Sequence, residues 1–158
     1  MTRRRAALGL LTAALLPKAF AAPGAGALLP MARSLTAELE QALAARQPLV
    51  VMVSLDGCPW CRIVRENYLR PLRAAGKLPV VQVDIASAAP LQDFAGRATT
   101  HDALTRAWNV DTAPTLLFFG RQAREVAPRL VGVGSPDFYG AYLDDRIRVA
   151  RAVIAEKG

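Results

Sequence analysis

The only two cysteines of the chain are three residues apart and lie where a predicted strand passes into a predicted helix. Residues 49–53, which precede them, are apolar and rich in β-branched side chains, as is typical of a central strand buried on both faces. Asp56 and Gly57 then predict a turn, and residues 62–75 carry apolar side chains at helical spacing. This succession indicates an α/β fold with the C-x-x-C pair at the start of a helix.

Helices and strands alternate along the rest of the chain. The predicted helices cover residues 35–46, 62–75, 101–108 and 136–154, and the predicted strands cover residues 49–53, 79–85, 115–119 and 125–133. Ser34, Thr100 and Ser135 are predicted N-caps, Pro71 is expected to kink its helix, and Pro128 favours an edge strand. Long early connections favour parallel strands and the short last one a hairpin, so we expect a mixed central β-sheet flanked by helices.

The N-terminus has the three parts of a secretory signal peptide. Basic residues 3–5 precede an apolar run at 6–16 and small residues at 19–22, which predicts cleavage near Ala21. The apolar run is shorter than the roughly 20 residues that cross a bilayer as a helix. We therefore predict a signal peptide at residues 1–21, a linker at 22–32 and one domain at 33–158, exported to the periplasm or an equivalent compartment. Both Sec and twin-arginine export stay open.

Composition supports a folded domain and argues against nucleic acid as a partner. The chain is 53% hydrophobic and 21% charged, which gives it ample apolar surface to bury. Four cations precede the expected cleavage site, and without them the formal net charge of +7 falls to +3. The other arginines are interleaved with Asp and Glu, as on an ordinary solvated surface.

The position of the cysteines suits thiol-disulfide exchange. A thiolate is the attacking species, and the unpaired N–H groups and positive dipole at a helix N-terminus stabilise it. Cys58 is therefore the predicted nucleophile, and Pro59 fits the first helical turn. Cys61 lies three residues on, where it can attack a mixed disulfide on Cys58 and release the product.

Other uses of the cysteine pair fit the sequence less well. A structural zinc site needs four ligands, and the chain adds only His101 as a histidine. Haem attachment calls for histidine after the second cysteine, where Arg62 stands. A purely structural disulfide remains the simple alternative, although a three-residue span constrains the unfolded chain very little. No metal or cofactor is expected.

The chain resembles the thioredoxin superfamily and, within it, the exported thioredoxin-like proteins of the SoxW type. The resemblance covers roughly residues 35–154. The matching segments are Cys58-Pro59-Trp60-Cys61, the helix with Pro71, residues 80–84, residues 108–115, and Val131-Gly132. It implies a thioredoxin-like fold in which Pro114 is a cis-proline facing the dithiol and Ala113 pairs its backbone with a substrate strand. By the same resemblance, Trp60, Ala113, Pro114 and Gly132 surround Cys58 with an apolar docking surface.

Three features depart from this pattern or fall outside the predicted site. Thioredoxins carry a buried Asp six residues before the first cysteine, whereas this chain has Met52 there. Residues 86–99 form a longer connection than in thioredoxin, and we interpret them as surface decoration in preference to a partner-docking loop. His101 is predicted to lie on the surface at a helix start and not to act as a catalytic base.

The residues between and before the cysteines favour a reductase. Strong oxidants of the superfamily usually carry His between their cysteines, which Pro59 and Trp60 do not supply, and Asp56 disfavours a nearby anion. We expect protein disulfides as substrates and a membrane thiol donor of the DsbD or CcdA type as the source of electrons. A dithiol oxidase or isomerase is one alternative. A binding or metal-carrier protein without turnover is another.

Overall fold

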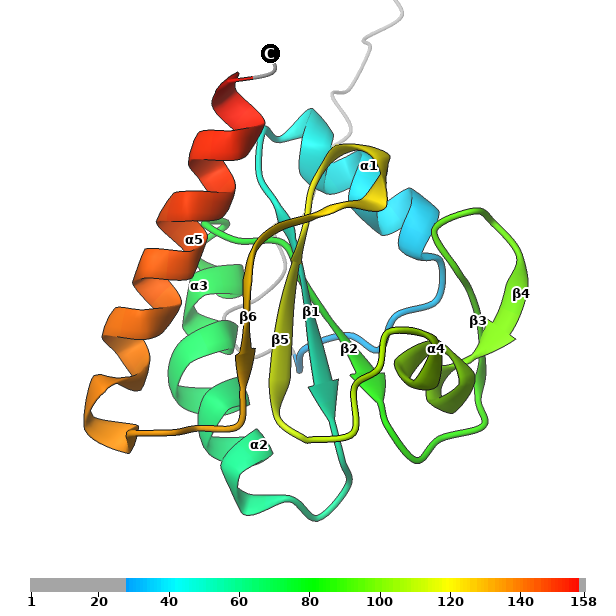
Figure 1. Cartoon of the computed structure of the whole chain (residues 1–158), viewed down its shortest axis with the longest axis horizontal. Helices are drawn as coiled ribbons and strands as arrows, with labels where there is room; N and C mark the ends of the chain where they lie inside the picture. Colours follow the sequence, from blue (N-terminus) through cyan, green and yellow to red (C-terminus); the bar gives the residue numbers. More distant parts are fainter. Residues whose placement is uncertain (1–27, 157–158) are drawn as a thin grey trace, which may run out of the picture.

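Four strands form the central sheet, in the order β2-β1-β5-β6 (Figure 1). They are β1 (Leu49–Ser54), β2 (Val80–Asp84), β5 (Thr115–Phe119) and β6 (Glu125–Val131). A computed structural model describes residues 28–156, so the predicted signal peptide and most of the predicted linker lie outside the described residues. Strand β1 is parallel to β2 and antiparallel to β5, which pairs antiparallel with β6. The predicted mixed sheet is confirmed, with the Pro128 strand at an edge.

Helices cover both faces of the sheet and divide its apolar side chains into two core clusters. One face carries α2 (Pro59–Val64), η1 (Arg65–Leu69), α3 (Arg70–Ala74) and α5 (Tyr139–Glu156), and the other carries α1 (Leu35–Ala44) and α4 (His101–Ala107). All six residues of β1 are buried. Because strand side chains alternate, Val50 and Met52 join the first cluster while Val51 and Val53 join the second. The strand before the cysteines is thus the centre of the fold.

The helix after the cysteines contains a π-helical segment just before Pro71. Between α2 and α3, the five residues of η1 adopt π-helical geometry. A proline within a helix lacks an N–H and crowds the carbonyl four residues earlier, which here belongs to Asn67 inside η1. The predicted kink is therefore accommodated as a wider turn that precedes the proline.

Residues 86–99, predicted as surface decoration, are mostly exposed and contribute most of a second, two-stranded sheet. Strand β3 (Pro90–Gln92) pairs antiparallel with β4 (Ala98–Thr100). Leu91 is buried, and the Phe94 ring lies 4.6 Å from Phe119 and 6.1 Å from Trp108 between ring centroids. The hairpin itself was not predicted, because strands of three residues are too short to show a periodic pattern. The hairpin extends the core on the α1 and α4 face.

The packed part of the molecule begins earlier than Arg33, within the predicted linker. Leu29 and Ala32 are buried. Backbone hydrogen bonds join this segment to β2, from the N–H of Ala32 to the Gln82 carbonyl and from the N–H of Gln82 to the Pro30 carbonyl, both 2.8 Å. Residues 29–32 therefore cover the otherwise open edge of β2, which satisfies backbone groups that an edge strand leaves unpaired.

Two of the three predicted N-caps are confirmed. Ser34 Oγ accepts a hydrogen bond from the N–H of Ala37, and Thr100 Oγ1 accepts one from Ala103, each at 3.4 Å. Ser135 makes no side-chain cap, because the 3-10 turn η3 (Pro136–Phe138) intervenes before α5 and uses the Ser135 carbonyl instead.

Removing the Ser34 cap should weaken the domain modestly. Ser34→Ala is expected to lower the free energy of unfolding by about 1 kcal/mol, because an N–H at the start of α1 loses its acceptor. Ser34→Asp, which keeps an acceptor at this position, should stay within a few tenths of a kcal/mol of the original. Urea unfolding of the three proteins measures both effects, and equal midpoints for Ser34→Ala and the original would show that the cap contributes nothing.

Candidate active site

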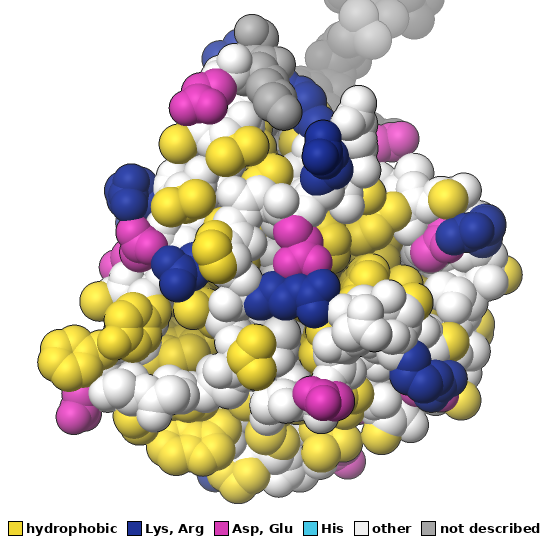
Figure 2. Space-filling view, viewed as in Figure 1, with side chains coloured by type: hydrophobic (Ala, Val, Ile, Leu, Met, Phe, Trp, Pro, Cys, Tyr) yellow, Lys and Arg dark blue, Asp and Glu magenta, His cyan; other side chains and the backbone are white. Residues whose placement is uncertain are grey.

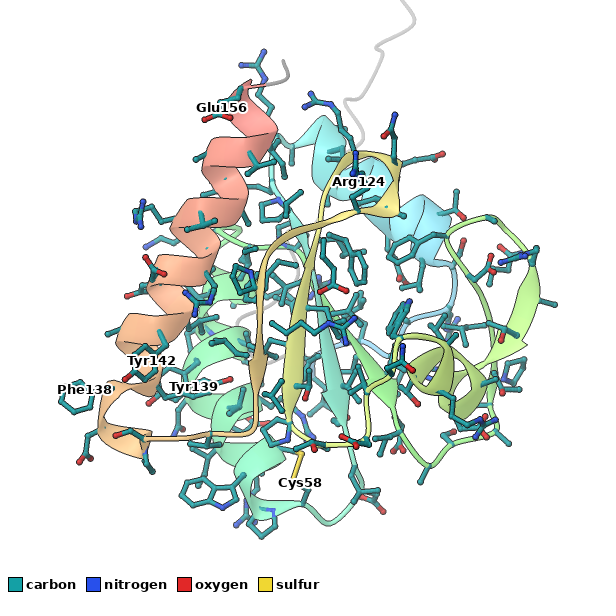
Figure 3. The ribbon with its side chains drawn as sticks, viewed as in Figure 1. Cys58, Arg124, Phe138, Tyr139, Tyr142 and Glu156 are labelled. Atoms are coloured by element: carbon teal, nitrogen blue, oxygen red, sulfur yellow. A yellow bond between two sulfur atoms is a disulfide. The ribbon has the colours of Figure 1, made fainter. Side chains whose placement is uncertain are left out.

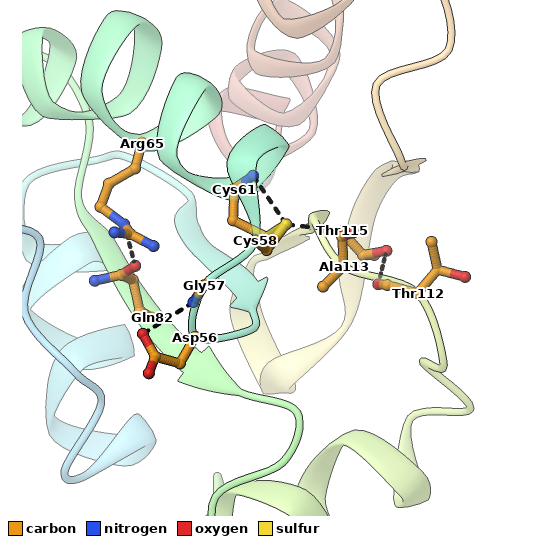
Figure 4. The surroundings of a disulfide bond; sticks show 9 residues. All are labelled: Asp56, Gly57, Cys58, Cys61, Arg65, Gln82, Thr112, Ala113 and Thr115. Carbon is orange, nitrogen blue, oxygen red and sulfur yellow. Dashed lines mark hydrogen bonds between the residues drawn. A yellow bond between two sulfur atoms is a disulfide. The ribbon is translucent and has the colours of Figure 1, made fainter.

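Cys58 and Cys61 form a disulfide at the start of α2 (Figure 4), with their Cα atoms 5.3 Å apart. Gly57 adopts a φ of +72°, in the left-handed region that favours glycine, which confirms the predicted turn. Cys58 is then the N-cap residue of α2, and Pro59 occupies the first helical turn. Cys58 is partly exposed, whereas Cys61 is 0% exposed. An external thiol or disulfide can therefore reach Cys58 and not Cys61.

The sulfur of Cys58 lies against backbone polar groups. The N–H of Cys61 donates to Cys58 Sγ at 3.1 Å, and this hydrogen bond caps the N-terminus of α2. This donor and the positive end of the helix stabilise a thiolate on Cys58 when the disulfide is reduced. On the other side, Cys58 Sγ lies 4.0 Å from the carbonyl oxygen of Ala113. The geometry thus provides for an anionic nucleophile at the partly exposed cysteine.

The structure brings all six predicted site residues to one end of the sheet. The peptide bond between Ala113 and Pro114 is cis, as the resemblance implied, and directly precedes β5. The N–H of Gly132 donates to the Pro114 carbonyl at 2.8 Å, which ties the end of β6 to this loop. Trp60 is 46% exposed between the two cysteines. A substrate-binding role for Trp60, Ala113, Pro114 and Gly132 stays a prediction.

Comparison with known proteins assigns the family. The protein-family model described as a thioredoxin-like domain matches residues 35–147. The chain belongs to the thioredoxin-like domain family. With its C-x-x-C pair in a disulfide at the helix start, this thioredoxin-like domain is a thiol-disulfide oxidoreductase.

Two solved thioredoxin structures, each with a TM-score of 0.50, share the fold of this thioredoxin-like domain. A poplar thioredoxin h is 16% identical, with 72% of this chain and 95% of that chain covered and a TM-score of 0.50. A thioredoxin of Schistosoma mansoni is 18% identical, with coverages of 77% and 97% and a TM-score of 0.50. Trxlp of Edwardsiella tarda is 28% identical, with coverages of 72% and 97% and a TM-score of 0.48. No curated protein matches the chain.

Arg65 and Gln82 form a polar pair without a carboxylate, beneath the helix that carries the cysteines. Met52 is buried in the same core cluster as Cys61, and its partner in the β1–β2 register is Gln82. The Gln82 amide is bound at both ends, since Oε1 accepts from Arg65 Nε and Nε2 donates to the Leu29 carbonyl, both at 2.7 Å. Arg65 lies four residues after Cys61 and so projects from the same side of the helix (Figure 4). That spacing was visible in the sequence, whereas its pairing with Gln82 was not.

His101 is buried, and its predicted surface position was wrong. It is 3% exposed, and its Nδ1 accepts a hydrogen bond from the backbone N–H of Asp84 at 3.3 Å. Burial lowers the pKa of the imidazole, and the opposing effect of the Asp84 carboxylate is smaller. The residue joins the start of α4 to the end of β2 as a neutral acceptor. A helix start is usually exposed, but here the His101 side chain bonds to the end of β2 and its backbone N–H donates to the Ala89 carbonyl at 3.2 Å.

The buried imidazole should make the domain less stable at mildly acidic pH. Because folding lowers the pKa of this histidine, the unfolded chain binds more protons than the folded chain once the pH falls below about 6.5, the ordinary histidine pKa. The free energy of unfolding therefore decreases as the pH falls below that value. We expect urea unfolding to give a lower free energy at pH 5 than at pH 7.5. His101→Gln, although less stable at pH 7.5, should lose this pH dependence. An unchanged dependence in His101→Gln would contradict the assignment.

Residues 28–156 contain neither a cluster of metal ligands nor a membrane-spanning helix. Within this range, no group of three or more His, Cys, Asp and Glu side chains is arranged to hold a metal ion. No helix in the described part of the chain is long and apolar enough to cross a membrane.

Proposed function

We propose that the protein is an exported reductase of protein disulfides. The direction of electron transfer is inferred from the polar groups that contact Cys58 Sγ. These are the N–H of Cys61 and the carbonyl of Ala113. Among the described residues, no cationic side chain is bonded to this sulfur. A weakly stabilised thiolate makes the reduced form a better electron donor, because strong oxidants of this kind owe their potential to a stabilised reduced state.

The nearest charged side chain in sequence supports the same direction. Asp56 lies two residues before Cys58, is exposed, and accepts a hydrogen bond from the N–H of Gly57 at 3.0 Å. Its negative charge disfavours a thiolate on Cys58, although solvent screens the effect. The reduced dithiol therefore passes its electrons on more readily.

The reaction proceeds by two exchanges at sulfur. The Cys58 thiolate attacks one sulfur of the substrate disulfide, and a mixed disulfide forms as the other substrate sulfur leaves as a thiolate. Cys61, held 5.3 Å away between Cα atoms, then loses its proton and attacks Cys58 Sγ. The protein disulfide forms and the second substrate thiolate leaves. The substrate gains two electrons, which the protein dithiol loses.

Turnover requires a source of electrons outside the molecule. The signal-like residues 1–21 support export to an oxidising compartment, where a dithiol does not stay reduced without a donor. We propose that a membrane thiol protein of the DsbD or CcdA type re-reduces the Cys58–Cys61 disulfide by the reverse of these exchanges.

The midpoint potential of the Cys58–Cys61 couple tests the proposed direction. The purified domain is equilibrated in dithiothreitol and glutathione buffers, acid-quenched and alkylated, and the reduced fraction is counted by mass. A midpoint potential near about −270 mV, that of thioredoxin, supports the reductase. A value near about −120 mV, that of the oxidant DsbA, contradicts it and favours the oxidase alternative.

A further inference from the structure

Exposed large apolar side chains are concentrated at the dithiol end of the molecule. Two such residues, Leu28 and Met31, precede α1. The other six in the described chain are Leu55, Trp60, Ile63, Val131, Phe138 and Tyr142. Leu55 follows β1, and Trp60 and Ile63 lie on α2. Val131 is the last residue of β6, beside the loop with the cis-proline. Such clustering marks an interaction surface better than single exposed side chains do.

Phe138 and Tyr142 are aromatic residues held outward at the start of α5 (Figure 3). They are 60% and 47% exposed and stand four residues apart. Tyr139, between them in sequence, is buried, and its ring lies 5.2 Å from that of Tyr68 between centroids. The backbone that carries the two exposed rings is thus anchored in the core, so both can bind a partner with little loss of conformational freedom.

These two rings lie within reach of a chain bound at the dithiol. Gly132 is bonded to Pro114, and the six residues from there to Phe138 span at most about 20 Å. Figure 2 shows yellow side chains gathered along the lower left edge, over α2 and the start of α5. An extended polypeptide that passes the cis-proline loop, where Cys58 Sγ lies 4.0 Å from the Ala113 carbonyl oxygen, can therefore reach Phe138 with about six further residues.

We infer that Phe138 and Tyr142 bind an apolar segment of the protein substrate, a few residues from the cysteine that exchanges with Cys58. This inference rests on the proposed action on protein disulfides and names the class of substrate. Continuity with the dithiol site favours a polypeptide substrate as the occupant. A membrane surface is disfavoured because the acidic Asp137 adjoins Phe138, and because Arg62, beside Ile63, is the one Lys or Arg next in sequence to any of the six residues, whereas anionic lipids attract clusters of such cations.

Peptides that differ only in their flanks test the inference. Each carries one cysteine as a mixed disulfide with thionitrobenzoate and has the same length and net charge. One series carries a Leu-Phe pair three to six residues before or after the cysteine, and the other carries Ser-Gln there. Chemically reduced protein attacks the disulfide through Cys58, and the coloured thionitrobenzoate thiolate leaves while the peptide sulfur stays bound until Cys61 displaces it as a thiol.

The variants separate this surface from the chemistry. We expect the original protein to react about tenfold faster, measured as the second-order rate constant of thionitrobenzoate release, with the Leu-Phe peptide in its better placement. Phe138→Ser/Tyr142→Ser should lose this preference and keep its rate with the Ser-Gln peptide. Met31→Ser, which removes an exposed apolar side chain elsewhere, should keep the preference. Phe138→Leu/Tyr142→Leu should keep most of it, and matching urea unfolding curves confirm that the variants fold.

Several outcomes would overturn the inference. A preference that survives in Phe138→Ser/Tyr142→Ser, or none in the original, contradicts an apolar contact here while the proposed reductase stands. Binding of the original protein to phosphatidylglycerol vesicles that this double variant loses assigns the pair to a membrane instead. Failure of the original protein to react with any peptide, although it reduces a small disulfide, contradicts the proposed function on protein substrates and the inference with it.

Discussion

Cys58→Ser should abolish disulfide exchange, whereas Cys61→Ser should stop the reaction after its first step. The partly exposed Cys58 is the sulfur that a substrate can reach, so its loss should lower the rate at least about 10³-fold, to near the uncatalysed level. Cys61 is fully buried and acts only within the protein, so its loss should leave the first attack intact. The two substitutions remove one sulfur each yet should leave different products.

Trapping shows the difference directly. After incubation with a protein disulfide such as insulin, Cys61→Ser should accumulate a mixed disulfide on a non-reducing gel, and the band should disappear with dithiothreitol. Cys58→Ser should yield no such band at the same concentration. Applied to an extract of exported proteins, Cys61→Ser should also capture the physiological substrate. If Cys58→Ser kept full biological activity, the protein would instead be a binding or carrier protein without turnover.

Met52→Asp should destabilise the domain by about 3–5 kcal/mol at pH 7. The side chain of Met52 is fully buried on the α2 and α5 face, and Gln82, its neighbour in register, already binds Arg65 and the Leu29 carbonyl. A carboxylate there would be desolvated without a free partner, although thioredoxins accommodate one at the corresponding position. The core of this chain is therefore built around an apolar residue at this point.

The destabilisation should depend on pH in a definite sense. Burial raises the pKa of the new carboxyl above its unfolded value, so the neutral form is favoured in the folded state. Stability is then greatest below the unfolded pKa and is lost as pH rises through the folded one. Urea unfolding at pH 5 and pH 8 should show a larger deficit at pH 8, while Met52→Leu should cost less than about 1.5 kcal/mol at both. A Met52→Asp protein as stable as the original would show that Arg65 or solvent reaches this site.

The sequence predicted the elements whose side chains repeat over several residues. The apolar run of β1 and the spacing along α5 were long enough to identify, and their turn residues marked the ends. The β3–β4 hairpin was missed because each strand has three residues and its anchors, Leu91 and Phe94, are isolated in a polar stretch. His101 was misplaced for a related reason, since the elements that bury it come from distant parts of the chain.

The residues of the site were predictable because chemistry restricts them. Cys58 and Cys61 are identified by their spacing, and the resemblance to thioredoxins implied that the loop with Pro114 faces them. The pairing of Arg65 with Gln82 was not predictable, because it depends on strand register and on the wider turn of η1. The outward position of Phe138 likewise depends on the 3-10 turn before α5. The sequence predicted that Ser135 caps the helix directly, with no such turn.

A count of thiols through a single turnover tests the central claim most directly. The domain is fully reduced, mixed with a slight excess of insulin, quenched with acid and alkylated, and the thiols of each partner are counted by mass. Thiol-disulfide exchange predicts that two thiols, Cys58 and Cys61, disappear from the protein for every two that appear in insulin. Insulin left oxidised beside a dithiol that stays reduced would contradict the claim.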